Sequence, residues 1–388
     1  MFNKVFFSQT GNGTTALILS YMSFAIGYIA GPFGAIFFGH IGDRKGRKVT
    51  MYASLLMMGI STSIIGILPP AASAGVGVVI VLQLMRLAQC FGRGGTWGGG
   101  ILMAYENVPE NKRSFYAAIP QIGLPIGFGL SSILIAVPTL LLPEDIFFTW
   151  GWRIPFLAAI ILTVIVIRQK GEMMETEDYK KAQAKLEAEE AEGKKHKVGF
   201  IPMVKGYWKT LLLGCGTRWV DGTFYNIFIV WILSYCINWL GMPLIQTYII
   251  TIIACIFKIP FTLFGGWCAQ KLGNTRTFVI GALASAVLSI PTLKVIELSK
   301  GNLAITIIGI VLGWSIAYNL IWAVISSLWS SYFETEVRYS GISFVYHVPS
   351  FLVAGMVPTI CTLLINYGKG DTIYVGIYST VVALITAA

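Results

Sequence analysis

The sequence predicts an all-α protein that crosses a membrane many times, and three observations carry that prediction. Hydrophobic residues make up 55% of the 388 residues and charged residues only 12%, against about 25% charged in a soluble domain. The apolar residues form long continuous runs without the alternation of a membrane β-barrel. Lys and Arg gather in alternate connections between these runs, as they do in membrane proteins of fixed orientation.

Eleven apolar runs are long enough to be membrane spans, because a spanning helix needs about 20 mostly apolar residues. They cover roughly residues 14–38, 50–68, 75–106, 115–140, 153–169, 207–235, 243–268, 277–297, 303–333, 339–365 and 372–388. Each is therefore expected to form a helix that lies in the lipid bilayer.

Basic residues orient these spans. The loop 39–49 is strongly basic, and the connections with Lys112, Lys205, Lys271 and Arg338 lie on the same side. This side is predicted to be cytoplasmic, in a multi-pass protein of the inner membrane. The odd span count places the N-terminus outside, which predicts that a first helix is missing through a fragment or a late start codon. The net charge of +10 thus signals orientation and not a nucleic-acid partner.

A charged segment divides the spans into two sets. Residues 168–197 hold eight Lys/Arg and eight Asp/Glu, which favours a solvated helix. The sequence therefore predicts a helical bundle over 1–168, a cytoplasmic loop over 169–206 and a second bundle over 207–388. The segment Gly39–Gly46 recurs 227 residues later as Gly266–Gly273. Because Arg113 and Arg338 are 225 apart, the two bundles are predicted to be parallel, pseudo-symmetric repeats.

The first basic loop carries the most specific motif, a closely spaced set of glycines and charged residues: Gly39, Asp43, Arg44, Gly46, Arg47 and Lys48. Its glycines permit a tight turn and close helix approach. Its aspartate can accept hydrogen bonds at a neighbouring helix N-terminus, and its basic residues are expected to anchor the loop at the inner membrane surface. The alternative is a positive-inside turn with no further role.

This loop resembles the signature loop of the major facilitator superfamily. A closer resemblance, to its metabolite:H+ symporter family, rests on segments 31–43, 94–100, 120–125 and 150–156. It implies a fold of twelve helices, of which about eleven lie in this chain, and a loop that latches the outward-open state. It also implies proton-coupled symport of a small polar metabolite, either an organic acid or a zwitterionic osmolyte. Arg93, Thr96 and Gln270 depart from the family pattern.

Ionisable residues within spans are candidates for substrate or proton binding. Arg86 begins an Arg-x-x-Gln motif that, by resemblance, faces the transport cavity; it can instead pair with backbone carbonyls. Arg218 and Asp221 are three apart on one helix face. They form either a static pair or a titrating one, in which protonation frees the arginine for an anion. Lys258 either binds a carboxylate or extends toward the inner surface.

Other polar residues in the spans suit a cavity near the membrane midplane: Tyr225, Asn226, Gln121, Asn319 and His347. The histidine is either a proton relay or a hydrogen-bonded structural residue. Glu106 and Glu110, at the cytoplasmic end of a span, are interpreted as gate or interface charges.

Several classes of function lack support in the sequence. There is no phosphate-binding loop for ATP and no catalytic motif. The six cysteines are scattered, so neither a metal site nor a cofactor is predicted. The predicted partners are the metabolite, H+ and the lipid bilayer, and the oligomeric state stays open, with a monomer plausible. An uncoupled uniporter or exchanger and a transport-dead membrane sensor are the alternatives.

Overall fold

The computed structural model describes residue 6 and residues 13–169, 175–191 and 200–388, which are helical apart from turns and short connections and contain no strand. In chain order the elements are α2 (Gly13–Lys45), α3 (Arg47–Ile67), α4 (Ala71–Ala74), α5 (Val76–Glu106), η1 (Glu110–Lys112), α6 (Arg113–Ala118), η2 (Pro120–Ile122), α7 (Gly123–Leu141), α8 (Glu144–Thr149), η3 (Gly151–Arg153), α9 (Ile154–Arg168), α10 (Glu177–Ala191), α11 (Phe200–Asn226), η5 (Ile227–Trp231), α12 (Ile232–Asn238), α13 (Leu244–Leu272), α14 (Asn274–Leu298), α15 (Leu303–Ile310), η6 (Val311–Ala317), α16 (Asn319–Ser330), α17 (Arg338–His347), η7 (Phe351–Gly355), α18 (Val357–Tyr367) and α19 (Ile373–Ala387).

Helices occupy all eleven predicted spans. Nine helical segments of the described chain are long and apolar enough to cross a membrane. The two others are α5, whose 31 residues pack along α2 and α3, and the shorter apolar helix α19. The prediction of an all-α membrane protein is therefore confirmed.

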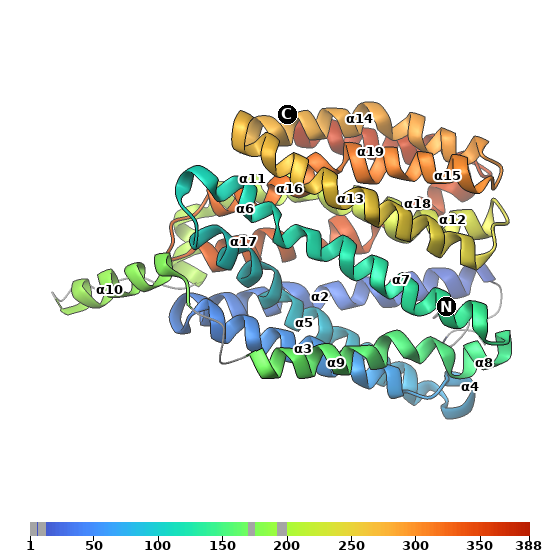
Figure 1. Cartoon of the computed structure of the whole chain (residues 1–388), viewed down its shortest axis with the longest axis horizontal. Helices are drawn as coiled ribbons and strands as arrows, with labels where there is room; N and C mark the ends of the chain where they lie inside the picture. Colours follow the sequence, from blue (N-terminus) through green and yellow to red (C-terminus); the bar gives the residue numbers. More distant parts are fainter. Residues whose placement is uncertain (1–5, 7–12, 170–174, 192–199) are drawn as a thin grey trace.

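The helices form an elongated bundle in which the two halves of the sequence take opposite sides (Figure 1). Helices α3 and α9 lie on one side, and α14 and α19 on the other. Helices α2, α7, α13 and α17 lie between them and make contacts from one half of the sequence to the other: α17 packs on α2, and α13 packs on α7. This inner layer is where a site shared by both halves can form.

Helices α2 and α5 cross so closely that their backbones touch. A Cβ atom added at Gly34 of α2 would overlap the backbone of Phe91, and one added at Gly94 of α5 would overlap Gly34 itself. Small residues allow such close crossings between membrane helices. The crossing fixes where the side chains of the adjacent residues on α2 and α5 point.

The repeat predicted from residue spacing is visible in the backbone. Gly46 precedes α3 with φ 102° and ψ 157°, and Gly273 precedes α14 with φ 92° and ψ 155°. Lys112 and Val337, which precede α6 and α17, share a φ of −123° with ψ of −4° and 3°. Equivalent positions of the two halves thus adopt the same turns.

Three helices of the second half contain wide π-helical turns, at η5, η6 and η7. Such turns shift the hydrogen-bond register and are frequent at functional sites. Here they interrupt helices that face the first half or enclose a buried lysine.

Helix α10 projects beyond the bundle at one end (Figure 1). The basic connections lie at this end, which is called the basic end below and is predicted to face the cytoplasm. The helix predicted for the charged segment is present as α10, at Glu177–Ala191. The rest of that prediction, residues 170–174 and 192–199, lies outside the described residues.

Candidate functional site

A cavity of about 280 Å³ lies between the two halves. Its walls come from seven elements of the inner layer and its neighbours: Tyr28, Arg93, Trp97, Pro120, Gln121 and Leu124 of the first half, and Arg218, Asp221, Tyr225, Trp322 and Tyr346 of the second. The lining is largely aromatic, with charges of both signs, and its size approaches the range of about 300–1,000 Å³ typical of ligand pockets.

The acid of this cavity, Asp221 on α11, is only 1% exposed. One of its oxygens pairs with the guanidinium of Arg218, one helical turn away, and the other accepts a hydrogen bond from the Tyr318 hydroxyl. Both oxygens of the carboxylate are therefore held by protein groups. Protonation of Asp221 would break the ion pair and leave the Arg218 charge available to an anion.

Arg218 is held in place by the last turn of α17. Its Nε donates to the Tyr346 carbonyl at 3.3 Å, and its guanidinium carbon lies 4.3 Å from the centroid of the Tyr346 ring. A cation over an aromatic face is stabilised by the ring quadrupole. The arginine can thus keep a stable position whether or not Asp221 is charged.

Aromatic and amide contacts join the halves around the cavity. The Trp97 and Tyr346 rings stack with centroids 4.3 Å apart. Gln121 and Trp322 exchange hydrogen bonds, since each side-chain nitrogen donates to the other's carbonyl at 3.1 Å. These contacts, which are made by side chains, border the cavity on the side of the basic end.

The predicted candidates divide among several places. Gln121, Tyr225, Arg218 and Asp221 line the central cavity. Arg86 instead lines a second cavity of about 230 Å³ within the first half, which shares Tyr28 and Arg93 with the central one.

Lys258 of α13 lies inside the second half and does not extend to the membrane surface. It is completely buried, its Nζ donates to the Trp314 carbonyl in the η6 turn at 3.4 Å, and it lies 4.5 Å from the ring centroids of Trp314 and Tyr318. Asn319 binds the Lys258 carbonyl at 2.9 Å, so it positions α13. Neither residue lines the central cavity.

Asn226 and His347 also lie behind the cavity wall. The Asn226 amide donates to the Gly222 carbonyl at 2.8 Å within its own helix. His347 is 1% exposed and packs against α2, where a Cβ added at Gly31 would lie 3.2 Å from its Nδ1.

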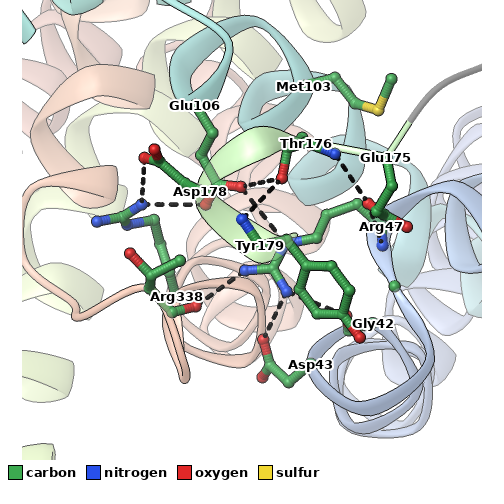
Figure 2. Close-up of polar contacts among 12 residues, drawn as sticks. Gly42, Asp43, Arg47, Met103, Glu106, Glu175, Thr176, Asp178, Tyr179 and Arg338 are labelled. Atoms are coloured by element: carbon green, nitrogen blue, oxygen red, sulfur yellow. Dashed lines mark hydrogen bonds and ion pairs between the residues drawn. The ribbon is translucent and has the colours of Figure 1, made fainter. Parts of the chain in front are cut away.

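A buried ion network closes the basic end (Figure 2). Glu106, at the end of α5, accepts from Arg338 of α17 at 3.0 Å and lies 3.5 Å from the Arg47 Nε. Thr176 donates to the same carboxylate at 2.7 Å. Arg47 in turn donates to the Thr335 carbonyl at 2.9 Å. Glu106, Arg47, Arg338, Thr176 and Thr335 are together called the clamp. The clamp joins the first half of the chain to the second.

Two equivalent contacts flank the clamp. Asp43 accepts from the Ser340 amide at 3.2 Å, at the third residue of α17. Gln270, its counterpart in the repeat, accepts from the Phe115 amide at 3.3 Å, at the third residue of α6. Both acceptors satisfy a free amide in a helix first turn, where negative charge is favoured. The glutamine that departs from the family pattern therefore keeps the contact but not the charge.

The segment Glu175–Tyr179, which runs into the first turn of α10, lies across the clamp and is called the strap (Figure 2). The Glu175 carboxylate accepts from the amides of Arg47 and Lys48 at 2.9 and 3.2 Å, at the start of α3. Asp178 binds Arg113 at 2.6 Å, and the Tyr179 ring centroid lies 4.5 Å from the Arg47 guanidinium carbon.

The burial of Arg47 corrects its predicted place at the membrane surface. Arg47 is completely buried, whereas Arg44 is exposed and Lys48 half-buried. The basic pattern suggested surface anchoring for all three, but Arg47 lies near Asp43 of its own loop and is also enclosed by Glu106 of α5 and by the strap, which are distant in sequence. Gly39 packs on α17, where an added Cβ would lie 3.0 Å from the Ser340 Cα.

Sequence reasoning missed one charged residue of the cavity, several aromatic residues around it, and the strap. Arg93 lies two helical turns after Arg86 and lines the central cavity, and its position inside a span was a sufficient signal to include it. Tyr28, Trp97, Tyr318 and Tyr346 could not be distinguished from the many lipid-facing aromatics. The strap had no signal, because its partners are set by tertiary contacts alone.

Replacing Gly46 by alanine is expected to destabilise the protein more than the same change at Gly273. Both glycines have positive φ, which costs a residue with a Cβ about 1–2 kcal/mol. An added Cβ at Gly46 would also overlap the Glu175 carboxylate, whereas nothing lies within 4 Å of one at Gly273. The Gly46→Ala variant should therefore unfold at the lower temperature in detergent, and equal midpoints would show that the strap contact contributes nothing.

Comparison with known proteins gives consistent results. A family model described as Major Facilitator Superfamily matches residues 6–358. The inner membrane metabolite transport protein YhjE of Escherichia coli K12 is 33% identical over 100% of this chain and 86% of that protein. The Shikimate transporter of the same strain is 30% identical over 100% and 86%. The Proline/betaine transporter of Salmonella typhimurium LT2 is 28% identical over 98% and 76%.

Among solved structures, the proton:xylose symporter XylE bound to 6-bromo-6-deoxy-D-glucose superposes with a TM-score of 0.78. It covers 99% of this chain and 87% of that one at 17% identity. At this identity the match shows the fold.

Proposed function

Because this chain belongs to the major facilitator superfamily and is an inner-membrane transporter, not an enzyme, we propose that it carries a small polar metabolite together with protons. The observation on which the proposal depends is the Arg218–Asp221 pair on the wall of the central cavity. A buried carboxylate that is paired with a cation can instead bind a proton, which breaks the ion pair. Proton binding therefore changes the charge presented to the substrate.

In an alternating-access cycle the Arg218–Asp221 pair is open to one side of the membrane at a time. The bundles 1–168 and 207–388, joined by the loop 169–206, rock about the cavity between them. The clamp and the contacts of Asp43 and Gln270 support this proposal. All of them lie at the basic end and join the two halves there, so they must break for the cavity to open at that end. Asp43 and Arg47 are then the latch of the outward-facing state.

The relatives suggest the chemical range of the cargo. One relative is named for shikimate, an organic acid, and another for proline and betaine, which are zwitterions. A transporter of either kind fits the proposal, which concerns the coupling and not the choice between them.

Uptake into proteoliposomes tests the coupling. Labelled shikimate and glycine betaine are supplied outside vesicles that are alkaline inside, with and without a proton ionophore. The pH gradient should drive accumulation above the external concentration, and the ionophore should remove it. Uptake that is saturable but indifferent to the ionophore would indicate an uncoupled uniporter or exchanger instead.

A further inference from the structure

Arg93 is a cation on the cavity wall that contacts the neutral side chains of Tyr28 and Cys90. Its guanidinium carbon lies 4.5 Å from the centroid of the Tyr28 ring, and its Nη2 lies 3.7 Å from the Cys90 sulfur. Its Nε has no hydrogen-bond partner among the described residues. Arg93 is half-buried, and a guanidinium without a nearby counter-charge can bind a carboxylate through paired hydrogen bonds. The arrangement therefore suits an anion that comes from outside the chain.

The charges on the cavity wall do not cancel. Arg93 and Arg218 contribute two positive charges and Asp221 one negative charge, which leaves a net charge of +1. One carboxylate on the substrate makes the occupied cavity neutral. When Asp221 is protonated the wall carries a net charge of +2, which a second carboxylate can match, whereas an electrically neutral zwitterion leaves the excess charge in place in either state.

Two of the aromatic faces that could hold an ammonium group are already covered by arginines. Quaternary ammonium ligands are recognised by aromatic faces, but Arg93 covers Tyr28 and Arg218 covers Tyr346 at 4.5 and 4.3 Å. The Tyr346 ring is also stacked on Trp97. An ammonium group at Tyr28 or Tyr346 would therefore meet a guanidinium in place of a free ring.

From these contacts we infer that the site selects compact organic anions with one or two carboxylates over zwitterions, and that Arg93 of the first half and Arg218 of the second hold a carboxylate between them. The inference rests on the proposed transport function for its site and adds the substrate class and a specificity residue, Arg93. Because the two arginines come from different halves, the bound carboxylate also bridges the halves.

Equilibrium binding in detergent tests this without any proton gradient. The full chain is titrated at pH 7.5 with labelled shikimate, lactate and benzoate as monocarboxylates and with glycine betaine as a zwitterion. At least one monocarboxylate should bind 10-fold or more tightly than betaine. Arg93→Met should weaken its binding about 10- to 100-fold, the usual effect of losing a charged hydrogen bond, and Arg93→Lys should restore most of it. Arg276→Met, which removes an exposed arginine, is the matched control.

Three results would overturn the inference: betaine binding as tight as that of every monocarboxylate, unchanged binding in Arg93→Met, or an equal loss in Arg276→Met. A folded Arg93→Lys variant that binds as poorly as Arg93→Met would also contradict it. These outcomes are separate from the coupling, because a protein that selects betaine can still accumulate it under a pH gradient, and one that selects monocarboxylates can still fail to respond to the ionophore.

Discussion

Asp221→Asn is expected to abolish uphill accumulation while exchange of labelled for unlabelled substrate continues. The asparagine keeps the shape of the side chain and can still accept from Tyr318, but it cannot bind and release a proton. Arg218 then stays available to an anion in every step, so substrate can cross without a proton. The measurement compares gradient-driven uptake with counterflow in the same vesicles.

The matched control is Asp371→Asn at the opposite end of the bundle from the clamp. Asp371 also pairs with a cation, Lys294, at 2.7 Å, and the hydrogen bond from Lys294 lowers the pKa of Asp371, so it is ionised at neutral pH. A partly exposed pair of this kind contributes little to stability, and accumulation should persist in the control. Accumulation by Asp221→Asn at the wild-type level would refute the role of Asp221 in coupling.

Asp221→Asn can also weaken folding, because it leaves Arg218 without its counter-charge. Breaking a buried ion pair costs about 3–5 kcal/mol, although the adjoining cavity lets water reach the arginine. Counterflow in the same preparation shows whether the variant is folded, so lost accumulation with retained exchange separates coupling from stability.

Glu106→Gln is expected to open the basic end. Glu106 is the acid that both Arg47 and Arg338 approach, and removing its charge leaves two buried cations close together. Even half of the roughly 3–5 kcal/mol at stake in a buried pair would shift the balance between open and closed forms more than tenfold. The backbone amides of 338–343 at the start of α17 should then exchange hydrogen for deuterium faster in detergent.

Glu110→Gln provides the comparison four residues away. The Glu110 side chain is 90% exposed and lies 3.8 Å from Arg113, so its neutralisation should leave exchange at α17 unchanged. Equal acceleration in both variants would point to a general effect of charge at this end and not to the clamp. The affinity for external substrate should fall in Glu106→Gln alone, because fewer molecules present the outward-facing cavity.

The course of the chain through the membrane was predictable because its signals are local. An apolar run of about 20 residues has no other stable place than lipid or a large core, and the basic connections fall at one end as the pattern requires. The turn at Gly46 and its repeat at Gly273 were predictable for the same reason, since a residue with positive φ strongly favours glycine.

The site was predictable only in part. Arg218 and Asp221 could be paired because three residues of helix bring them onto one face, and the structure places that face on the cavity. The same reasoning could not place Lys258, which points into its own half, because the direction of a helix face depends on the helices packed around it. Gln121 and Tyr225 line the cavity, whereas Asn226, the neighbour of Tyr225, points behind it.

The sequence by itself determined that this protein is helical, lies in the membrane, and consists of two related halves with a basic side, because each of these depends on composition and on residues a few positions apart. Tertiary structure alone decided that Glu106 meets Arg338 across the halves and that the strap covers Arg47. It also decided that Arg93 faces Asp221 and Arg218 across one cavity. The Glu106–Arg338 contact alone joins residues 232 positions apart, and such contacts depend on how helices rotate and cross when their small residues pack together, which no local pattern specifies.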